Sequence, residues 1–194
     1  MKTGGIKIKP HLLFILGSMI IMGSCHQMSE HIEDKSAGMN GGFEVSKNGL
    51  PVNWLMYTPK TVPDGDFNII LDKDIFKEGK QSLRFEVKAC SSAGEWRSPG
   101  FTNDFFEIGK YRGEGQYKLS CWIRNDGTEF SLSAGGVSAK TGNMITFIRE
   151  SKPLNEWELL EYTIDVPEDQ WLRMQLNILK PGSFWIDDIR IEKI

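Results

Sequence analysis

Residues 41–194 contain no histidine, because His11, His26 and His31 all lie nearer the start of the chain. Nucleophilic Ser-His-Asp and Cys-His systems need an imidazole to carry the proton, and many zinc sites need it as a ligand. These catalytic systems and His-based zinc sites are therefore excluded from this part of the chain. A metal site built from cysteine alone is excluded as well, because the whole chain has only three cysteines.

Two of those cysteines, Cys90 and Cys121, fall within residues 41–194. A disulfide between them is open to a protein that works outside the cytoplasm. Against a disulfide, the residue pattern places Cys121 at a core-facing position, whereas Cys90 comes just past the end of another apolar run. The sequence alone leaves the pairing open.

The chain also lacks a surplus of basic residues. It has 23 Lys and Arg residues against 26 Asp and Glu residues, which gives a formal net charge of −3 at pH 7. Proteins that bind nucleic acid carry a basic patch that neutralises phosphates. Nucleic acid is therefore not an expected partner.

A glycosidase needs only two carboxylates at a defined separation, so the missing histidines do not by themselves exclude this activity. The sequence has no clustered acidic strand motif, however. The nearest approach is Glu158 with Glu161 and Asp165, and that spacing is typical of a solvated surface. We therefore do not expect an enzyme.

No stretch of twelve residues after residue 40 shows the apolar period of an amphipathic helix. Apolar residues instead alternate with polar ones, as they do in half-buried strands, through residues 83–88, 117–124, 162–166 and 172–178. Gly, Pro, Asn and Asp residues, which favour turns, separate these runs. The pattern predicts one all-β domain of about 150 residues, an antiparallel β-sandwich or jelly roll.

The first 24 residues have the order of a secretory signal, with a basic start, an apolar run over residues 12–22 and the small pair Gly23-Ser24. The apolar run is too short to span a bilayer as a mature helix. Cys25 follows the small pair directly, and this arrangement resembles the bacterial lipobox. We therefore predict a signal peptide over residues 1–24 and a lipid anchor on Cys25 that holds the protein at a membrane. An ordinary secreted protein and an uncleaved anchor are the alternatives.

Residues 25–40 are polar and follow neither period, which predicts a flexible stalk before a folded domain at residues 41–194. His26, in a position where some lipoproteins have aspartate, resembles the pattern of lipoproteins sent to the outer membrane. We therefore expect the protein in the bacterial cell envelope, facing either the periplasm or the cell surface.

Five segments follow one another along the chain: NGGFE, GLPVNW, EGKQSL, YKLSCWIR and FWIDDIRI, at residues 40–44, 49–54, 78–83, 117–124 and 184–191. Their order and spacing resemble carbohydrate-binding modules of families 4, 9 and 22. The resemblance implies a galactose-binding-domain-like β-sandwich that binds a polysaccharide or an oligosaccharide without catalysis. Such sandwiches also serve as structural or adhesion modules, so a lipoprotein that contacts a protein partner is the alternative.

A sheet that binds sugar needs aromatic faces that stack on the sugar ring and fixed polar groups that hydrogen-bond its hydroxyls. If the apolar residues of the 117–124 run face the core, Trp122 and Arg124 lie on the outer face. Trp96 lies in a segment that resembles the part of family 22 modules where a tryptophan meets the ligand. The predicted ligand-binding residues are Trp96, Trp122, Arg124, Arg84, Glu86, Arg173, Gln175 and Asn177.

The aromatic residues of this set have structural alternatives. Trp122 could be covered by a loop or could pack beneath Trp96 instead of forming a platform. Trp54 and Tyr57 follow a Gly-Leu-Pro turn, and we expect them in the core or at its rim.

The charged residues of the set also have two interpretations. Arg84, Arg124 and Arg173 are predicted to lie on one face with Glu86 among them. There they could bind an acidic or a hydroxyl-rich sugar, because a guanidinium presents a fork of donors. Equally, they could form a solvated salt-bridge ladder across adjacent strands.

Glu44, Asp187 and Asp188 resemble positions at which these modules hold a structural Ca²⁺, an ion that prefers several oxygen ligands. Alternation places Asp187 on the core-facing side with Ile189 and Ile191, where an unpaired carboxylate is costly. A bound calcium ion, a buried hydrogen bond or a lysine partner would each compensate that carboxylate. The resemblance thus implies calcium as a structural cofactor.

Overall fold

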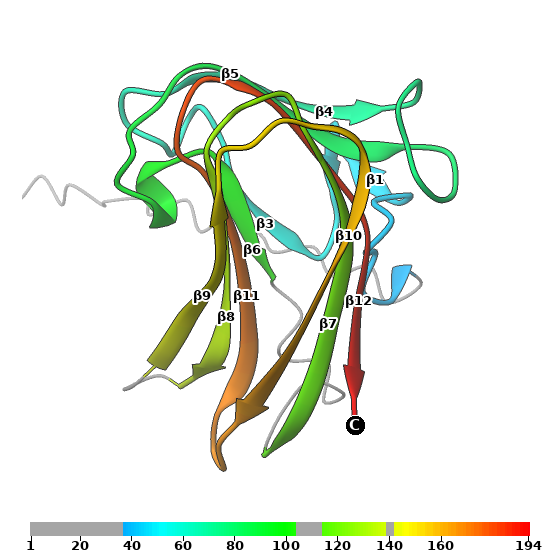
Figure 1. Ribbon diagram of the computed structural model, residues 1–194, viewed down its shortest axis with the longest axis vertical. Helices are drawn as coiled ribbons and strands as arrows, with labels where there is room; N and C mark the ends of the chain where they lie inside the picture. The colour runs from blue at the N-terminus through cyan, green and yellow to red at the C-terminus, as the bar shows by residue number, and fades with distance from the viewer. Residues whose placement is uncertain (1–36, 104–113, 139–141) are drawn as a thin grey trace, which may run out of the picture. The chain divides into compact units, whose positions relative to one another are not determined.

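The computed structural model describes residues 37–103, 114–138 and 142–194, and within these ranges the chain forms a two-layered β-sandwich (Figure 1). Each layer is a sheet of five antiparallel strands. A short ribbon of β1 (Ser46–Lys47) and β2 (Leu50–Pro51) pairs separately. The predicted all-β antiparallel sandwich is confirmed.

We name the layers sheet I and sheet II. Sheet I has the order β10-β7-β12-β5-β4 and consists of β4 (Asp66–Asp72), β5 (Ser82–Ala89), β7 (Gly115–Asn125), β10 (Leu154–Val166) and β12 (Gly182–Lys193). Sheet II has the order β3-β6-β11-β8-β9 and consists of β3 (Trp54–Tyr57), β6 (Gly100–Asn103), β8 (Phe130–Val137), β9 (Gly142–Glu150) and β11 (Trp171–Ile178). One turn of 3-10 helix, η2 (Glu95–Arg97), precedes β6. No helix in the described part of the chain is long and apolar enough to cross a membrane.

The period of two seen in the sequence places the side chains of the long strands. In β7, Leu119, Cys121 and Ile123 are buried between the sheets, and Trp122 and Arg124 alternate with them on the outer face. β11 follows the same rule. Each sheet therefore has an inner face that makes the core and an outer face that is available for other contacts.

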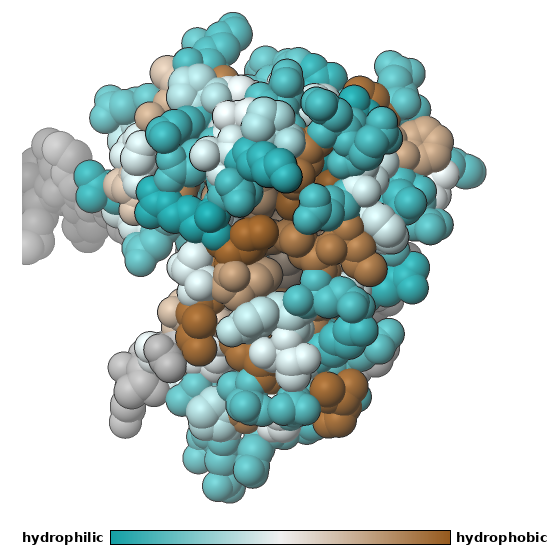
Figure 2. Space-filling view, viewed as in Figure 1, coloured by the Kyte–Doolittle hydropathy of each residue, from teal (hydrophilic) through white to brown (hydrophobic). Residues whose placement is uncertain are grey.

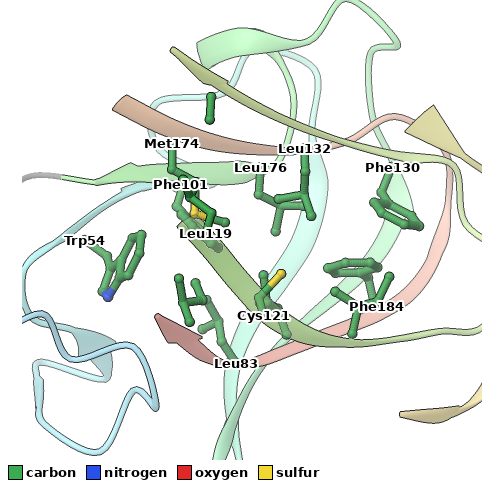
Figure 3. Packing of buried hydrophobic residues seen from close by; sticks show 14 of the residues in the cluster. Trp54, Leu83, Phe101, Leu119, Cys121, Phe130, Leu132, Met174, Leu176 and Phe184 are labelled. Carbon is green, nitrogen blue, oxygen red and sulfur yellow. The ribbon is translucent and has the colours of Figure 1, made fainter. Parts of the chain in front are cut away.

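The core between the sheets is rich in aromatic side chains (Figure 3). The ring centroids of Phe130 in β8 and Phe184 in β12 lie 4.6 Å apart, and those of Trp54 and Phe101 lie 4.9 Å apart. Fully burying one such side chain stabilises a fold by roughly 1.5–3 kcal/mol. The contact of Phe130 with Phe184 ties sheet II to sheet I, whereas Trp54 and Phe101 pack within sheet II.

Along one edge of the sandwich, β9 of sheet II and β10 of sheet I meet through side chains instead of a hydrogen-bonded ladder. The rings of Phe147 and Tyr162 stack there, with centroids 4.4 Å apart and an interplanar angle of 12°. Figure 2 shows apolar surface between the two sheets on this side. The core thus reaches the surface along this edge.

Both cysteines of the described residues are free. Cys121 points into the core from the middle of β7, and burial raises the pKa of its thiol to about 12. Cys90 is half-buried and follows the last residue of β5. The disulfide that the sequence left open therefore does not form.

Asn40, which the sequence pattern assigned to the stalk, belongs to the folded domain. Its side-chain amide donates to the backbone oxygens of Val45 (2.8 Å) and Val52 (2.9 Å) and accepts from the Val45 N–H (3.0 Å). Asn40 has a φ of 55°, a conformation that asparagine tolerates better than most residues. The predicted signal peptide and Cys25 lie outside the described residues.

We predict that Asn40→Asp lowers the free energy of unfolding by about 2 kcal/mol, because a carboxylate cannot donate to the two carbonyl oxygens that Asn40 faces. Urea unfolding measures this change. Asn155→Asp, at an exposed position of β10, is the matched control and should leave stability nearly unchanged. Equal stabilities of the two variants would contradict the role given to Asn40.

Candidate functional site

The predicted ligand-binding residues divide between the two outer faces of the sandwich. Arg84 and Glu86 lie in β5, and Trp122 and Arg124 lie in β7, so all four belong to sheet I. Arg173, Gln175 and Asn177 lie in β11, in the middle of sheet II. The prediction that Arg84, Arg124 and Arg173 share one face is wrong, because alternation along a strand does not reveal which sheet the strand joins.

The outer face of sheet I is covered near Trp122 by the segment that joins β4 to β5. Lys77 from this segment lies over Trp122, with its ammonium 4.0 Å from the centroid of the ring. The backbone N–H groups of Lys77 and Glu78 donate to the Asp187 carboxylate at 2.7 and 3.0 Å, which holds the segment down. Trp122 therefore has a loop above it, which was the structural alternative for this residue.

The arginines of sheet I are engaged with neighbouring strands. Arg84 forms ion pairs with Asp72 (3.2 Å) and with Glu86, and Trp185 donates to Asp72 (2.9 Å). The guanidinium groups of Arg84 and Arg124 lie 5.3 and 5.6 Å from the centroid of the Trp185 ring, one on each neighbouring strand. This is a ladder of ion pairs and cation–π contacts across four strands, β4, β5, β12 and β7.

Asp72 is the acceptor at the centre of this ladder. Burial acts to raise the pKa of its carboxyl, but hydrogen bonds from Trp185, from the backbone N–H groups of Asp74 and Ile75, and from Arg84 together hold it below the ordinary value. The carboxylate is therefore ionised at neutral pH. It ties β4 to β5 and β12.

The carboxylates of the predicted calcium site are engaged by hydrogen-bond donors. Glu44 accepts from the Lys80 N–H (2.8 Å), and Asp188 pairs with Arg190 (2.7 Å). Asp187 accepts from Lys77, Glu78 and the Asp188 N–H. Among the residues that the structure describes, no three His, Cys, Asp or Glu side chains gather as a metal cluster. These contacts give calcium no support, and calcium stays a prediction.

The sequence alternation predicted that Asp187 faces the core, and this prediction is wrong. The register of β12 against β7 shifts between Asp187 and Arg190, and Asp188 at the shift has a φ of 47°. This bulge turns Asp187 onto the outer face opposite Trp122, where the β4–β5 segment buries it. Burial raises the pKa of the Asp187 carboxyl despite its three backbone N–H donors. Hydrogen bonds from three backbone N–H groups compensate the buried Asp187 carboxylate, which was one of the alternatives that the sequence left open.

The outer face of sheet II carries a groove, a cavity of about 300 Å³ over β11, β8 and β9. The segment before η2 forms one side of it. Two predicted ligand residues, Gln175 and Asn177, line the groove, and the rest of the lining combines hydroxyl side chains with charged and apolar ones. The lining residues used below are Glu95, Ser133, Thr146, Arg149, Gln175 and Asn177.

Trp96 lies in η2, next to the groove-lining residue Glu95, and is 56% exposed. Its segment is held in place by local hydrogen bonds. Ser98 Oγ donates to the Ser91 oxygen (2.5 Å) and accepts from the Gly94 N–H (2.9 Å). A large apolar ring is thus presented to solvent from a segment whose backbone is held by hydrogen bonds.

The amides of the groove are oriented by their partners. Gln175 Nε2 donates to the Tyr57 hydroxyl (3.2 Å), and Asn177 Nδ2 donates to the backbone oxygen of Glu95 (2.9 Å). Each amide keeps its carbonyl oxygen and a second N–H for another partner. Ser133 and Thr146 add two hydroxyls, 2.9 Å apart across β8 and β9.

Tyr57 is a residue of this region that the sequence assigned to the core or its rim. Burial raises the pKa of its phenol, Arg173 nearby acts to lower it and Glu95 to raise it. The phenol is therefore protonated at neutral pH, and it can donate a hydrogen bond while it accepts from Gln175. The sequence contains a pattern that places the Tyr57 side chain. Trp54 and Met56 are buried, so alternation along β3 directs Tyr57 to the outer face.

No protein-family model matches the chain. In sequence, it is similar to alpha-L-arabinofuranosidases 1 and 2 of Arabidopsis thaliana, at 27% identity over 163 and 165 residues. These alignments cover 77% of this chain and 23% of each enzyme. The chain therefore spans about a quarter of the length of the curated relatives that it matches.

Solved structures show the likeness in fold. A CBM22 xylan-binding domain from Paenibacillus barcinonensis matches with a TM-score of 0.55 at 10% identity, over 79% of this chain and 92% of that domain. An arabinose-bound α-L-arabinofuranosidase matches with a TM-score of 0.51 at 15% identity, over 79% of this chain and 26% of that enzyme. The fold is thus a two-sheet sandwich like that of CBM22 domains, as the resemblance implied.

We predict that Asp72→Asn lowers the free energy of unfolding at pH 7 by about 3 kcal/mol, because it leaves Arg84 without its buried partner. The folded-state pKa of Asp72 lies below its ordinary value, so its contribution is present above that value and is lost as the pH falls through the folded-state pKa. Urea unfolding at pH 7 and at pH 3 measures the difference.

The gap between wild type and Asp72→Asn should therefore narrow at the lower pH. Asp165→Asn, at an exposed position of β10, serves as the control and should cost little at either pH. A variant as stable as the wild type at pH 7 would show that Asp72 does not hold the ladder together.

Proposed function

We propose that the protein binds a polysaccharide or an oligosaccharide, without catalysis, in the groove on the outer face of sheet II. The observation that carries the proposal is the exposed Trp96 beside a groove lined with hydroxyls and oriented amides. A sugar ring needs such a pair of features, an aromatic face for its apolar side and fixed polar groups for its hydroxyls.

The comparisons support this choice of ligand class. Domains that share the fold over most of their own length are described as xylan-binding. The curated relatives act on α-L-arabinofuranosides by name. Xylan and arabinose-bearing polysaccharides are therefore the first ligands to test.

Placement in the cell is a second part of the proposal. The leader and Cys25 would anchor the domain by lipid in the bacterial cell envelope, at the outer membrane, where polysaccharides outside the cytoplasm are within reach. The structural or adhesion lipoprotein remains the competing function, and the binding experiment separates the two.

Affinity gel electrophoresis of the chain from residue 26 onward tests binding against xylan, arabinoxylan and a panel of other soluble polysaccharides. We predict retardation by at least one of them, and Trp96→Ala should weaken binding by roughly fivefold to thirtyfold, since stacking on an aromatic ring contributes roughly 1–2 kcal/mol.

Trp122→Ala is the control, because Trp122 lies on the other sheet under Lys77 and should leave retardation unchanged once folding is verified by thermal unfolding. Normal migration in every gel, or an effect of Trp122→Ala equal to that of Trp96→Ala, would contradict the proposed site.

The anchor is tested by fractionation of cells that express the full chain. We predict that the wild-type protein sediments with membranes and that Cys25→Ser releases it into the soluble fraction, because the acylated thiol is lost. Cys90→Ser is the control, since Cys90 belongs to the folded domain. A Cys25→Ser protein that stays with the membranes would contradict the lipid anchor.

A further inference from the structure

Two cations and one carboxylate meet beside the groove. Glu129 Oε1 accepts from Arg149 Nε (2.7 Å) and Nη2 (2.5 Å), and Glu129 Oε2 pairs with Lys180 Nζ (2.6 Å). The exposure of the three side chains is unequal, with Glu129 15% exposed and Arg149 and Lys180 58% and 59% exposed. The carboxylate therefore lies beneath the cations, and we call the three residues the basic cluster.

The basic cluster has a net positive charge. Hydrogen bonds from Lys180 and then Arg149 lower the pKa of Glu129, so the cluster carries two positive charges and one negative charge at neutral pH. Glu150 lies nearby, but its carboxylate accepts from the backbone N–H groups of Ser151 and Lys152 at 2.8 and 2.9 Å. Glu150 keeps its own negative charge, and within the basic cluster Arg149 and Lys180 are the most exposed groups, at 58% and 59%.

Arg149 connects the basic cluster to the groove. It lines the groove itself and also an adjoining hollow of about 320 Å³ that Glu129, Glu150 and Ser151 complete. Its Nε and one Nη2 hydrogen are directed at Glu129, so the Nη1 edge of the guanidinium is left for another partner. A guanidinium held in a fixed orientation matches the two oxygens of a carboxylate.

We infer that the basic cluster is a subsite for an acidic substituent, the carboxylate of a uronic acid, on the glycan that lies in the groove. The inference rests on the proposed function, because the subsite extends the same groove. Neutral sugar residues would lie along Gln175 and Asn177, and the acidic side group would reach Arg149 and Lys180.

A pair of ligands that differ only in charge provides the test. Glucuronic-acid-substituted xylan is compared in affinity gels with the same polysaccharide after its carboxyl groups have been reduced to alcohols. We expect the wild-type protein to bind the acidic form roughly threefold to tenfold more tightly. This preference should shrink as salt is added, since exposed charges are screened.

Variants test whether the preference for the acidic polysaccharide comes from the basic cluster. Arg149→Gln should abolish the preference, so that the variant binds the acidic and the reduced polysaccharide equally, and Arg149→Lys should keep part of the preference through charge alone. Lys118→Gln is the control, because Lys118 forms a comparable exposed ion pair with Glu161 on sheet I and loses the same charge.

Equal binding of both ligands by the wild type would overturn the acidic subsite and leave the proposed function standing. Equal loss of preference in Arg149→Gln and Lys118→Gln would overturn it too, since the effect would then come from net charge. A protein that binds neither ligand would contradict the proposed function and this inference with it.

Discussion

The packing of two sheets through aromatic side chains is the constraint on which the rest of this structure depends. Each strand gives every second side chain to the core, so contacts such as Phe130 with Phe184 determine which residues point outward. A functional surface can then form only on an outer face or at a loop. The two outer faces differ because a connecting segment covers part of sheet I, whereas a groove stays open on sheet II.

On sheet I, the β4–β5 segment is tied down by carboxylates that accept its backbone N–H groups. Asp72, Asp187 and Glu44 all take part, and Lys77 lies over Trp122 as a result. On sheet II, the segment before η2 is held by its own neighbours, η2 itself accepts from Asn177 through the Glu95 oxygen, and the groove over β11 stays open. The closed face stabilises the fold, and the open face offers hydroxyls, amides and an exposed tryptophan.

The sequence predicted the fold class, the burial of alternate residues and the outward direction of every candidate in β5, β7 and β11. It could not predict which strands share a sheet, because pairing between distant strands leaves no mark in local alternation. For this reason Arg84, Arg124 and Arg173 were placed on one face. The sequence could not predict the bulge at Asp188 either. One extra residue in a strand reverses the alternation of the residues that follow it, and the position of that residue is set by the neighbouring strand. Tyr57 lies at the rim of the core as expected, partly buried, but the sequence did not show that its hydroxyl meets Gln175 of β11.

The most direct test of the account follows the indole N–H signals of Trp96 and Trp122 by NMR during titration with a xylan oligosaccharide. If the glycan lies in the groove of sheet II, the Trp96 signal shifts with added ligand, together with the side-chain amides of Gln175 and Asn177, while the Trp122 signal stays in place. A shift of Trp122 with Trp96 unchanged would move the site to sheet I and contradict the account.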